Sequence, residues 1–263
     1  MNTSSGLISL SKQWIKRIWA CLLYYTGIVR FYSHLSMNEK ALVLMYHRVL
    51  DENEGTPSIH PGMYVTRKVF SQHLEYLSKF YTVVTLEQLE EWFSGKRQIS
   101  GIPCLITFDD GWADNYDVAF PLLQKYSLPA AIFLITDQIG EKGMLTWPQA
   151  REMESFGISF GSHTVTHAVL KGKNHEEIRH ELRDSQKRLQ KELSRPSDWF
   201  CYPKGEYDQA ICAVVREFYS AALTTQRGPV SRGDDLFQMR RVGIHNDVSM
   251  TIPLFACMVT SLF

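Results

Sequence analysis

Short apolar runs alternate with longer amphipathic segments along most of this chain, and that alternation limits the folds open to it. Residues 41–46, 104–108 and 130–135 are typical of buried strands, whereas residues 66–77 and 174–193 carry apolar positions at helical spacing. Strands that alternate with amphipathic helices indicate a parallel sheet joined by helical crossovers. About seven or eight such units, without a glycine-rich phosphate-binding fingerprint, favour an α/β fold that is a distorted, TIM-like (β/α)7-8 barrel over an open doubly wound sheet.

Length and composition bound the organisation of the chain. Its 263 residues are enough for one large α/β domain, expected over 37–263, after an amphipathic or hydrophobic helical extension at 1–36. The formal net charge is zero and the sequence pI is about 7.1, so no basic surface points to nucleic acid. The five cysteines form no C-x-x-C pair, which indicates reduced thiols and favours a reducing compartment.

The N-terminal extension carries an uncharged run, residues 18–29, between Arg17 and Arg30. The run is shorter than the roughly 20 apolar residues that a membrane-spanning helix needs, and no small-x-small cleavage site follows it. Its aromatic residues and basic flanks favour an interfacial helix and a peripheral membrane association through residues 12–31; a helix packed on the domain is the alternative. The expected location is the cytoplasm or the inner face of the membrane, with an extracytoplasmic protein on an uncleaved anchor as the alternative.

Two adjacent carboxylates end one of the predicted strands. Asp109 and Asp110 follow residues 104–108, and Gly111 then permits a sharp turn without Cβ strain. Because strand side chains alternate between faces, the two acids are expected to point in different directions, so that one binds a metal while the other meets a substrate or a water molecule. The alternative is ordinary turn chemistry, since Asp and Gly are common in turns.

Two histidines, His163 and His167, follow a later predicted strand. Their spacing puts both rings on one side of a helical turn or of a tight strand-to-helix loop. Two imidazoles with one carboxylate are a common ligand set for a hydrolytic zinc ion, although a lone H-x-x-x-H pair is more often solvent-facing or part of a core. The two acids favour the metal interpretation, because barrel enzymes place their chemistry at the carboxyl ends of the strands. The candidate residues at the predicted strand ends are His47, Asp109, Asp110, His163, His167, Pro203 and His245.

The two motifs together resemble the signature of a known family. Thr107-Phe108-Asp109-Asp110-Gly111 followed by His163-Thr164-x-x-His167 is similar to the paired motif of the polysaccharide deacetylases, carbohydrate esterase family four, which share the NodB-homology domain. The resemblance extends from about Leu42 to about Ile244. It also includes Met45-Tyr46-His47-Arg48-Val49 and Tyr202-Pro203-Lys204-Gly205.

The resemblance implies a metal-dependent hydrolase of carbon–nitrogen bonds other than peptide bonds, which removes N-acetyl groups from a glycan that contains N-acetylhexosamine. It implies that Asp110, His163 and His167 bind a divalent metal, most often Zn²⁺, and that Asp109 is the general base. The chemistry is consistent, because such a metal acidifies water and polarises an amide carbonyl. A backbone N–H near Tyr202 and Pro203 is expected to stabilise the oxyanion, and Trp112, like Tyr202, is expected to offer an aromatic face to the sugar.

Two positions depart from the family pattern. Many members carry an arginine that tethers the catalytic Asp just before the Pro-x-Gly, where this chain has Cys201-Tyr202. Arg241 is the candidate to take that place beside Asp109. The general acid is expected near the last strand, where His245 lies, and His47 is the alternative donor or a residue that lines the site.

Two other functions fit the same residues. The metal centre could hydrolyse an O-acetyl ester on a glycan, because the fold does not fix the substrate. A non-catalytic carbohydrate-binding or assembly protein with a relic site is the other alternative. The presence of both acids and both histidines argues against a relic site, because a protein that no longer catalyses the reaction does not need these four residues.

Overall fold

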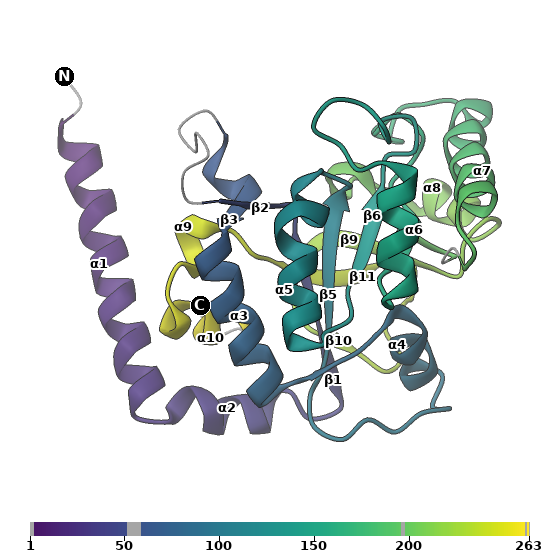
Figure 1. The fold of residues 1–263 in the computed structure, drawn as a ribbon. Coiled ribbons are helices and arrows are strands. Elements are labelled where there is room, and N and C mark those ends of the chain that lie inside the picture. The colour runs from purple at the N-terminus through teal and green to yellow at the C-terminus, as the bar shows by residue number, and fades with distance from the viewer. Residues whose placement is uncertain (1–2, 52–58, 196–197, 261, 263) are drawn as a thin grey trace.

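Seven parallel strands close into a barrel at the centre of the molecule (Figure 1). The structure is a computed structural model and describes residues 3–51, 59–195, 198–260 and 262, with the backbone alone for residues 3–13 and 61. Around the barrel the order is β1 (Lys40–Tyr46), β11 (Met239–Gly243), β9 (Ala221–Arg227), β8 (Trp199–Cys201), β7 (Ser159–Ser162), β6 (Ala131–Leu134) and β5 (Pro103–Asp110). β5 then pairs with β1, with Leu42 opposite Cys104 and Tyr46 opposite Phe108, and this pairing closes the ring. The TIM-like barrel predicted from the sequence is thus confirmed, with seven strands.

Four short strands lie at the margins of this barrel. β4 (Thr82–Val83) pairs with β5, and β10 (Val230–Ser231) pairs with β1. β2 (Arg48–Leu50) pairs with β3 (Tyr64–Thr66) in a separate two-stranded sheet. β2 follows β1 after only His47, so this small sheet lies beside the carboxyl end of the barrel, where the site residues are found.

The strands are buried on both of their faces, which explains why their sequences are continuous apolar runs. All eight residues of β5 are buried. Alternate residues of β1 pack into different clusters: Val43 joins the cluster of Leu105 and Phe133, whereas Leu44 joins that of Ile106. One cluster fills the barrel and the other lies between the strands and the helices, as expected for a parallel barrel.

Helices surround the strands (Figure 1) and begin where the sequence supplies caps. The helices after β3 are α3 (Arg67–Phe80), α4 (Leu86–Phe93), α5 (Phe120–Tyr126), α6 (Trp147–Ser155), α7 (His175–Glu192), α8 (Gln209–Val215), α9 (Asn246–Ser249) and α10 (Ile252–Val259), with short turns at η2 (Pro61–Met63), η3 (Asn115–Ala119) and η4 (Pro203–Gly205). Thr85 with Gln88 at α4, and Asn174 with Glu177 at α7, form the expected capping boxes.

Two helices precede the barrel, α1 (Thr3–Tyr25) and α2 (Ile28–Ser36), joined at Gly27 with φ 79°. α1 runs along the side of the molecule next to α10, and α2 turns beneath α3 (Figure 1). Arg17 Nη2 donates to Met250 Sδ at 2.9 Å, and Ala20 is fully buried, so one face of α1 packs on the domain. Among the helices of the described chain, none combines the length and the hydropathy needed to cross a membrane.

Candidate metal centre

The carboxyl end of β5 brings two buried acids to the mouth of the barrel. Asp109 and Asp110 are 3% and 6% exposed. The backbone turns sharply after them, with φ 77° at Asp110 and 87° at Gly111. A Cβ on Gly111 would lie 2.7 Å from Cδ2 of Leu134, so the turn requires glycine. As expected from strand alternation, the two carboxylates meet different partners.

Asp110 faces the two histidines. Its Oδ1 lies 3.6 Å from Nε2 of His163 and 3.6 Å from Nε2 of His167. Two ligands about 2.1 Å from one tetrahedral ion are separated by roughly 3.4 Å, so the spacing fits a shared metal. Burial lowers the pKa of His163, which leaves its ring neutral. Nδ1 of His163 lies 2.7 Å from the carbonyl oxygen of Cys201 and donates to it, which directs Nε2 toward Asp110. The residues present therefore fit a divalent metal.

A tight loop, and not a helical turn, carries the two histidines. His163 follows β7 directly, while Thr164 and His167 have φ of 68° and 64°. Glu181 of α7 braces this loop: its Oε2 accepts from the N–H of Val165 at 2.9 Å and of Thr166 at 3.0 Å. Its Oε1 accepts from the Thr166 hydroxyl at 2.7 Å. Glu181 is 6% exposed, and no motif in the sequence marked it as part of the site.

Trp112 supports the metal ligand instead of presenting a free ring. Its Nε1 donates to Oδ2 of Asp110 at 2.9 Å. The guanidinium of Arg48 lies 4.6 Å from the centre of the Trp112 ring, and Arg48 in turn donates to Asp114 at 2.7 Å. One face of the indole is therefore covered by a cation, which leaves at most the other face for a sugar.

Asp109 is bound by Arg241, as the sequence suggested. Nη1 and Nη2 of Arg241 donate to Oδ1 and Oδ2 of Asp109, each at 2.7 Å, although 132 residues separate the two. Arg241 also donates to the carbonyl of Thr224 at 2.8 Å, which fixes its direction. Burial alone would raise the pKa of Asp109, but the charge and hydrogen bonds of Arg241 outweigh it and hold that pKa well below its ordinary value. Asp109 is thus ionised at neutral pH.

A second group of potential ligands shares His163 but is occupied by the arginine. Asp109, His163 and Cys201 also bring ligand atoms within 4.8 Å of one another. However, Nη2 of Arg241 lies 2.7 Å from Oδ2 of Asp109 and 3.0 Å from Sγ of Cys201. A buried guanidinium at this position repels a second cation. The candidate metal position is therefore the one formed by Asp110, His163 and His167.

The two candidate proton donors lie in different surroundings. Nε2 of His47 is 4.0 Å from Oδ2 of Asp109. Burial lowers the pKa of His47, although the charges of Asp109 and Asp110 oppose this. His245 caps α9, and its Nδ1 pairs with Asp247. Within the described residues, no hydrogen bond or ion pair joins His245 to the other site residues.

Tyr202 and Pro203 lie directly after β8, at the turn η4. The backbone N–H of Tyr202 already donates to the carbonyl of Leu223 at 3.0 Å, and proline has no N–H. The Tyr202 side chain is fully buried and stacks on Tyr207, with ring centres 4.9 Å apart. The N–H and the ring of Tyr202 itself are therefore engaged within the domain, and an oxyanion donor near these two residues stays a prediction.

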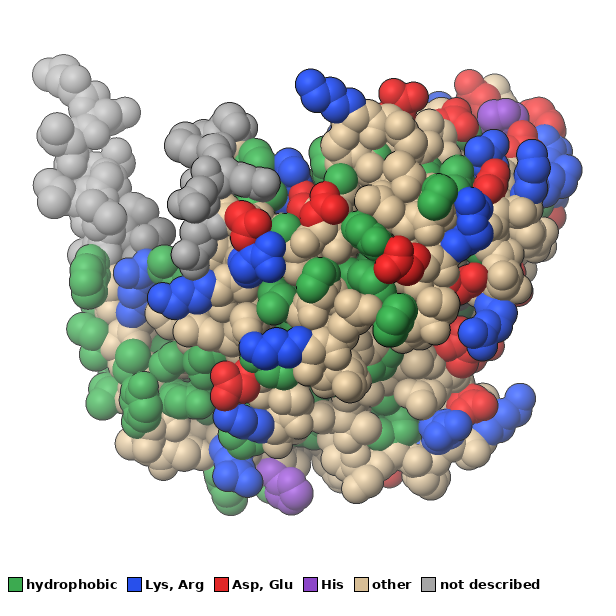
Figure 2. Space-filling view, viewed as in Figure 1, with side chains coloured by type: hydrophobic (Ala, Val, Ile, Leu, Met, Phe, Trp, Pro, Cys, Tyr) green, Lys and Arg blue, Asp and Glu red, His purple; other side chains and the backbone are tan. Residues whose placement is uncertain are grey.

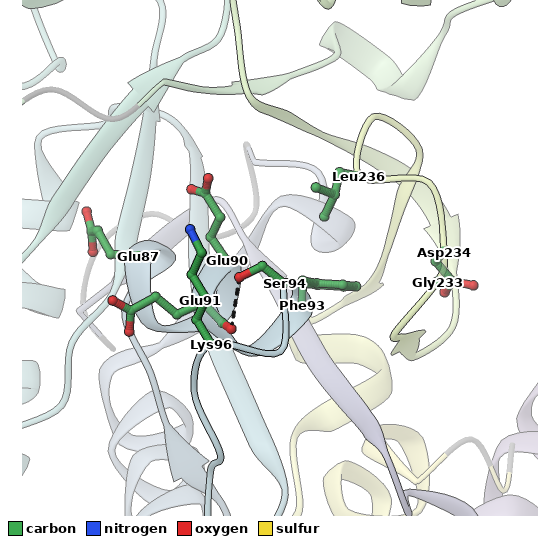
Figure 3. A pocket seen from close by; sticks show the side chains of 9 residues that line it. All are labelled: Glu87, Glu90, Glu91, Phe93, Ser94, Lys96, Gly233, Asp234 and Leu236. Carbon is green, nitrogen blue, oxygen red and sulfur yellow. Dashed lines mark hydrogen bonds between the residues drawn. The ribbon is translucent and has the colours of Figure 1, made fainter.

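A hollow lies at the opposite end of the barrel, and Figure 3 shows the side chains that line it. It measures about 450 Å³ and is lined by residues that include Glu87, Glu90 and Glu91 of α4 and Asp234. The indole of Trp199, at the start of β8, donates to Glu90 at 3.2 Å. Because the metal position lies beyond the carboxyl end of β8, the barrel separates the two.

Comparisons with known proteins agree with this geometry. The model of the polysaccharide deacetylase family matches residues 97–221. The Bacillus subtilis protein YxkH, named as a polysaccharide deacetylase, is 32% identical over 212 residues, which is 80% of this chain and 73% of YxkH. This chain belongs to the polysaccharide deacetylase family. It is therefore a hydrolase that acts on carbon–nitrogen bonds.

Further members of the polysaccharide deacetylase family match over most of their length. The poly-β-1,6-N-acetyl-D-glucosamine N-deacetylase of Staphylococcus epidermidis is 28% identical over 240 residues, 81% of each chain. The structure of the Streptococcus pyogenes deacetylase PplD in complex with acetate has a TM-score of 0.74 at 29% identity and covers 80% of this chain and 94% of its own. That of IcaB from Ammonifex degensii has a TM-score of 0.73 at 27% identity, with 84% and 97% covered.

Proposed function

We propose that this polysaccharide deacetylase removes N-acetyl groups from an N-acetylhexosamine-containing glycan, with zinc as its metal. The observation that carries the proposal is the placing of Asp110 Oδ1 at 3.6 Å from both His163 and His167, next to an ionised Asp109. Two imidazoles and one carboxylate are the ligand set that supports zinc.

The chain supplies a base at the metal position. A divalent metal bound there contributes Lewis-acid chemistry, because it polarises an acetyl carbonyl and lowers the pKa of water. Asp109 accepts the proton of the attacking water as general base. A carboxylate of low pKa is a weak base, but it is sufficient to take the proton from a water molecule whose own pKa has been lowered by a metal. Arg241 keeps the carboxylate ionised and fixed, since both of its oxygens accept from the guanidinium.

His47 is the proton donor that the geometry favours. The departing sugar amine must receive a proton, and His47 Nε2 lies 4.0 Å from Oδ2 of Asp109, the general base. Burial lowers the pKa of His47, so its ring readily passes on to the amine a proton that it takes up during the reaction. We expect His47→Gln to lower kcat by about 10²- to 10⁴-fold with metal content unchanged, while His245→Gln stays near the wild-type rate. The reverse result would give the role to His245.

A polymer of β-1,6-linked N-acetylglucosamine is the substrate that we propose. The support is the Staphylococcus epidermidis enzyme, which is named for that substrate and matches this chain over 81% of each length. Relatives named only as polysaccharide deacetylases also match, so the linkage is the point to test.

Acetate release from matched oligomers tests metal and substrate together. The protein is stripped with a chelator, reloaded with zinc, cobalt or manganese, and given β-1,6-linked or β-1,4-linked N-acetylglucosamine oligomers or an O-acetylated glycan. We expect release from the β-1,6 oligomer after zinc loading. Release from the O-acetylated glycan alone would select the esterase function. Binding without release under every metal would select the non-catalytic function.

We further propose that the enzyme acts at the inner face of the membrane as a peripheral protein. The support is the extension of two helices with basic and aromatic residues, together with five free cysteines. Fractionation of cells that produce the full chain, with protease added to intact cells, tests this. Membrane-bound and protease-resistant protein is expected, and digestion from outside would place the enzyme on the other face.

A further inference from the structure

Exposed apolar residues are concentrated on the two N-terminal helices. Of the twelve large hydrophobic side chains that are exposed in the described part of the chain, ten lie on α1 and α2. This set, here called the outer face, consists of Trp14, Ile15, Ile18, Trp19, Leu22, Tyr25, Ile28, Phe31, Tyr32 and Leu35. A patch of this kind on a soluble protein marks an interaction site. Figure 2 shows the hydrophobic side chains gathered over that edge of the molecule.

The outer face is regular and is separate from the packed face of the same helices. Residues 15, 18, 22 and 25 follow one helical stripe on α1, and residues 28, 31 and 35 follow another on α2. On the opposite side, Ala20 and Val29 are buried, and Leu23 and Tyr24 pack against the core. The helices are therefore held by the domain through one face, and the other face is left for a partner.

The charge of this segment indicates what the partner is. Residues 1–38 contain no Asp or Glu. Lys16 and Arg30 are exposed among the apolar residues, whereas Arg17 is directed toward Met250 of the domain. Aromatic side chains beside basic ones fit the headgroup level of an anionic bilayer. A second copy of this chain fits less well, because a symmetric contact through the outer face would bring the basic residues of both copies together.

A recess opens on the same surface, between α2 and the end of α3. It measures about 790 Å³, and Tyr25, Phe31, Phe80 and Arg30 are among the residues that line it. The guanidinium of Arg30 lies 5.4 Å from the centre of the Phe80 ring. An apolar recess with a cation in its lining suits the chain and headgroup of an anionic lipid.

We infer that the outer face and this recess form the docking surface for an anionic lipid bilayer, in which α1 and α2 lie at the level of the headgroups. This deepens the membrane-surface part of the proposed function and does not depend on deacetylation. A helix that packs on its own domain through one face and on lipid through the other combines the two interpretations that the sequence left as alternatives.

A native cysteine provides the test. Cys21 is exposed next to Leu22, whereas the other four cysteines are buried. The full chain, labelled at Cys21 with an environment-sensitive dye, is mixed with vesicles of phosphatidylglycerol and phosphatidylethanolamine or of phosphatidylcholine alone. We expect a blue shift and co-sedimentation with the anionic vesicles, both weakened by salt. The double variant Trp19→Ser and Phe31→Ser should bind about tenfold or more weakly.

Phe156 supplies the matched control, because it is 62% exposed and lies outside α1 and α2. Phe156→Ser should bind vesicles like the wild type. A dye on Phe156→Cys in a Cys21→Ser background should show no blue shift. Unchanged acetate release by the double variant would show that it is folded. Equal binding by all variants, no binding to any vesicle, or a dimer that the double variant dissociates would overturn the inference.

Discussion

The mouth of the barrel and the outer face depart from ordinary globular packing in opposite directions. At the mouth, charged groups are buried: Asp109 is 3% exposed and Arg241 is 1% exposed. On the outer face, apolar groups are exposed, with Phe31 at 68% and Trp19 at 56%. Both arrangements carry a cost, the first in desolvation and the second in contact of apolar surface with water. At the mouth the chain supplies the partner of the buried charge, as Arg241 does for Asp109, whereas for the outer face we infer a lipid partner.

Replacing the base at the mouth should have the largest effect. Asp109→Asn keeps the size of the side chain but cannot accept the proton, so we expect kcat to fall about 10²- to 10⁴-fold. Metal content should stay at the wild-type level, because Asp110, His163 and His167 are unchanged. Metal analysis beside acetate release checks both statements. Normal turnover with normal metal content would remove Asp109 as the base.

Removing the partner of Asp109 should cost folding as well as activity. Arg241→Gln leaves a buried carboxylate without its ion pair, and we expect the free energy of unfolding to fall by about 3–5 kcal/mol. The neighbouring Arg240 is the control, since its pair with Asp234 is at the surface. Arg240→Gln should stay within about 0.5 kcal/mol of the wild type in denaturant unfolding. Similar losses in both variants would mean that the buried pair has no special role.

The same pair predicts a change in pH dependence. In the wild type, Arg241 holds the pKa of Asp109 below its ordinary value. Ionisation of Asp109 therefore adds stability above about pH 4, and that stability is lost as the pH falls through the folded-state pKa. In Arg241→Gln the burial that raises this pKa is opposed only by the smaller effects of His163 and His47, so the acid limb of kcat/KM should move to higher pH. A limb that stays in place would show that another group sets it.

The brace of the histidine loop should give an intermediate effect. Glu181→Gln weakens three hydrogen bonds that order the loop between His163 and His167, so we expect about 10- to 100-fold weaker metal binding. Glu176→Gln, at an exposed position in the first turn of α7, is the control. Competition with a chromogenic chelator measures the affinity. Unchanged affinity in Glu181→Gln would show that the ligands alone hold the loop.

Local patterns made much of the fold predictable. Strands buried on both faces give apolar runs that need no partner to be recognised, as at residues 104–108. Capping boxes are formed within four residues, so those at Thr85 and Asn174 were visible in the sequence. Helix limits depend on single caps: α8 begins at Gln209, because the Asp208 side chain accepts from the N–H of Ile211 and caps it.

The site was predictable where its residues form short motifs and not where they meet across the barrel. Asp109, Asp110 and the two histidines stand in recognisable patterns. Glu181 does not, since its contact with the histidine loop is set by how α7 packs. The one available signal was its place on the buried stripe of that helix, three residues after Ile178 and four before Ser185. The apolar residues of 18–29 were visible, but which of them face outward depends on the packing of α1.

The smallest expected effect belongs to the outer face. Leu22 and Leu23 are neighbours on α1, but Leu22 is 52% exposed whereas Leu23 packs against the core. Leu22→Ser should change the free energy of unfolding by no more than about 0.5 kcal/mol, while Leu23→Ser should lower it by about 1–2 kcal/mol. Thermal or denaturant unfolding in the absence of lipid measures both. If the two variants were equally destabilised, the outer face would be packed in the free protein, and its contrast with the barrel mouth would be lost.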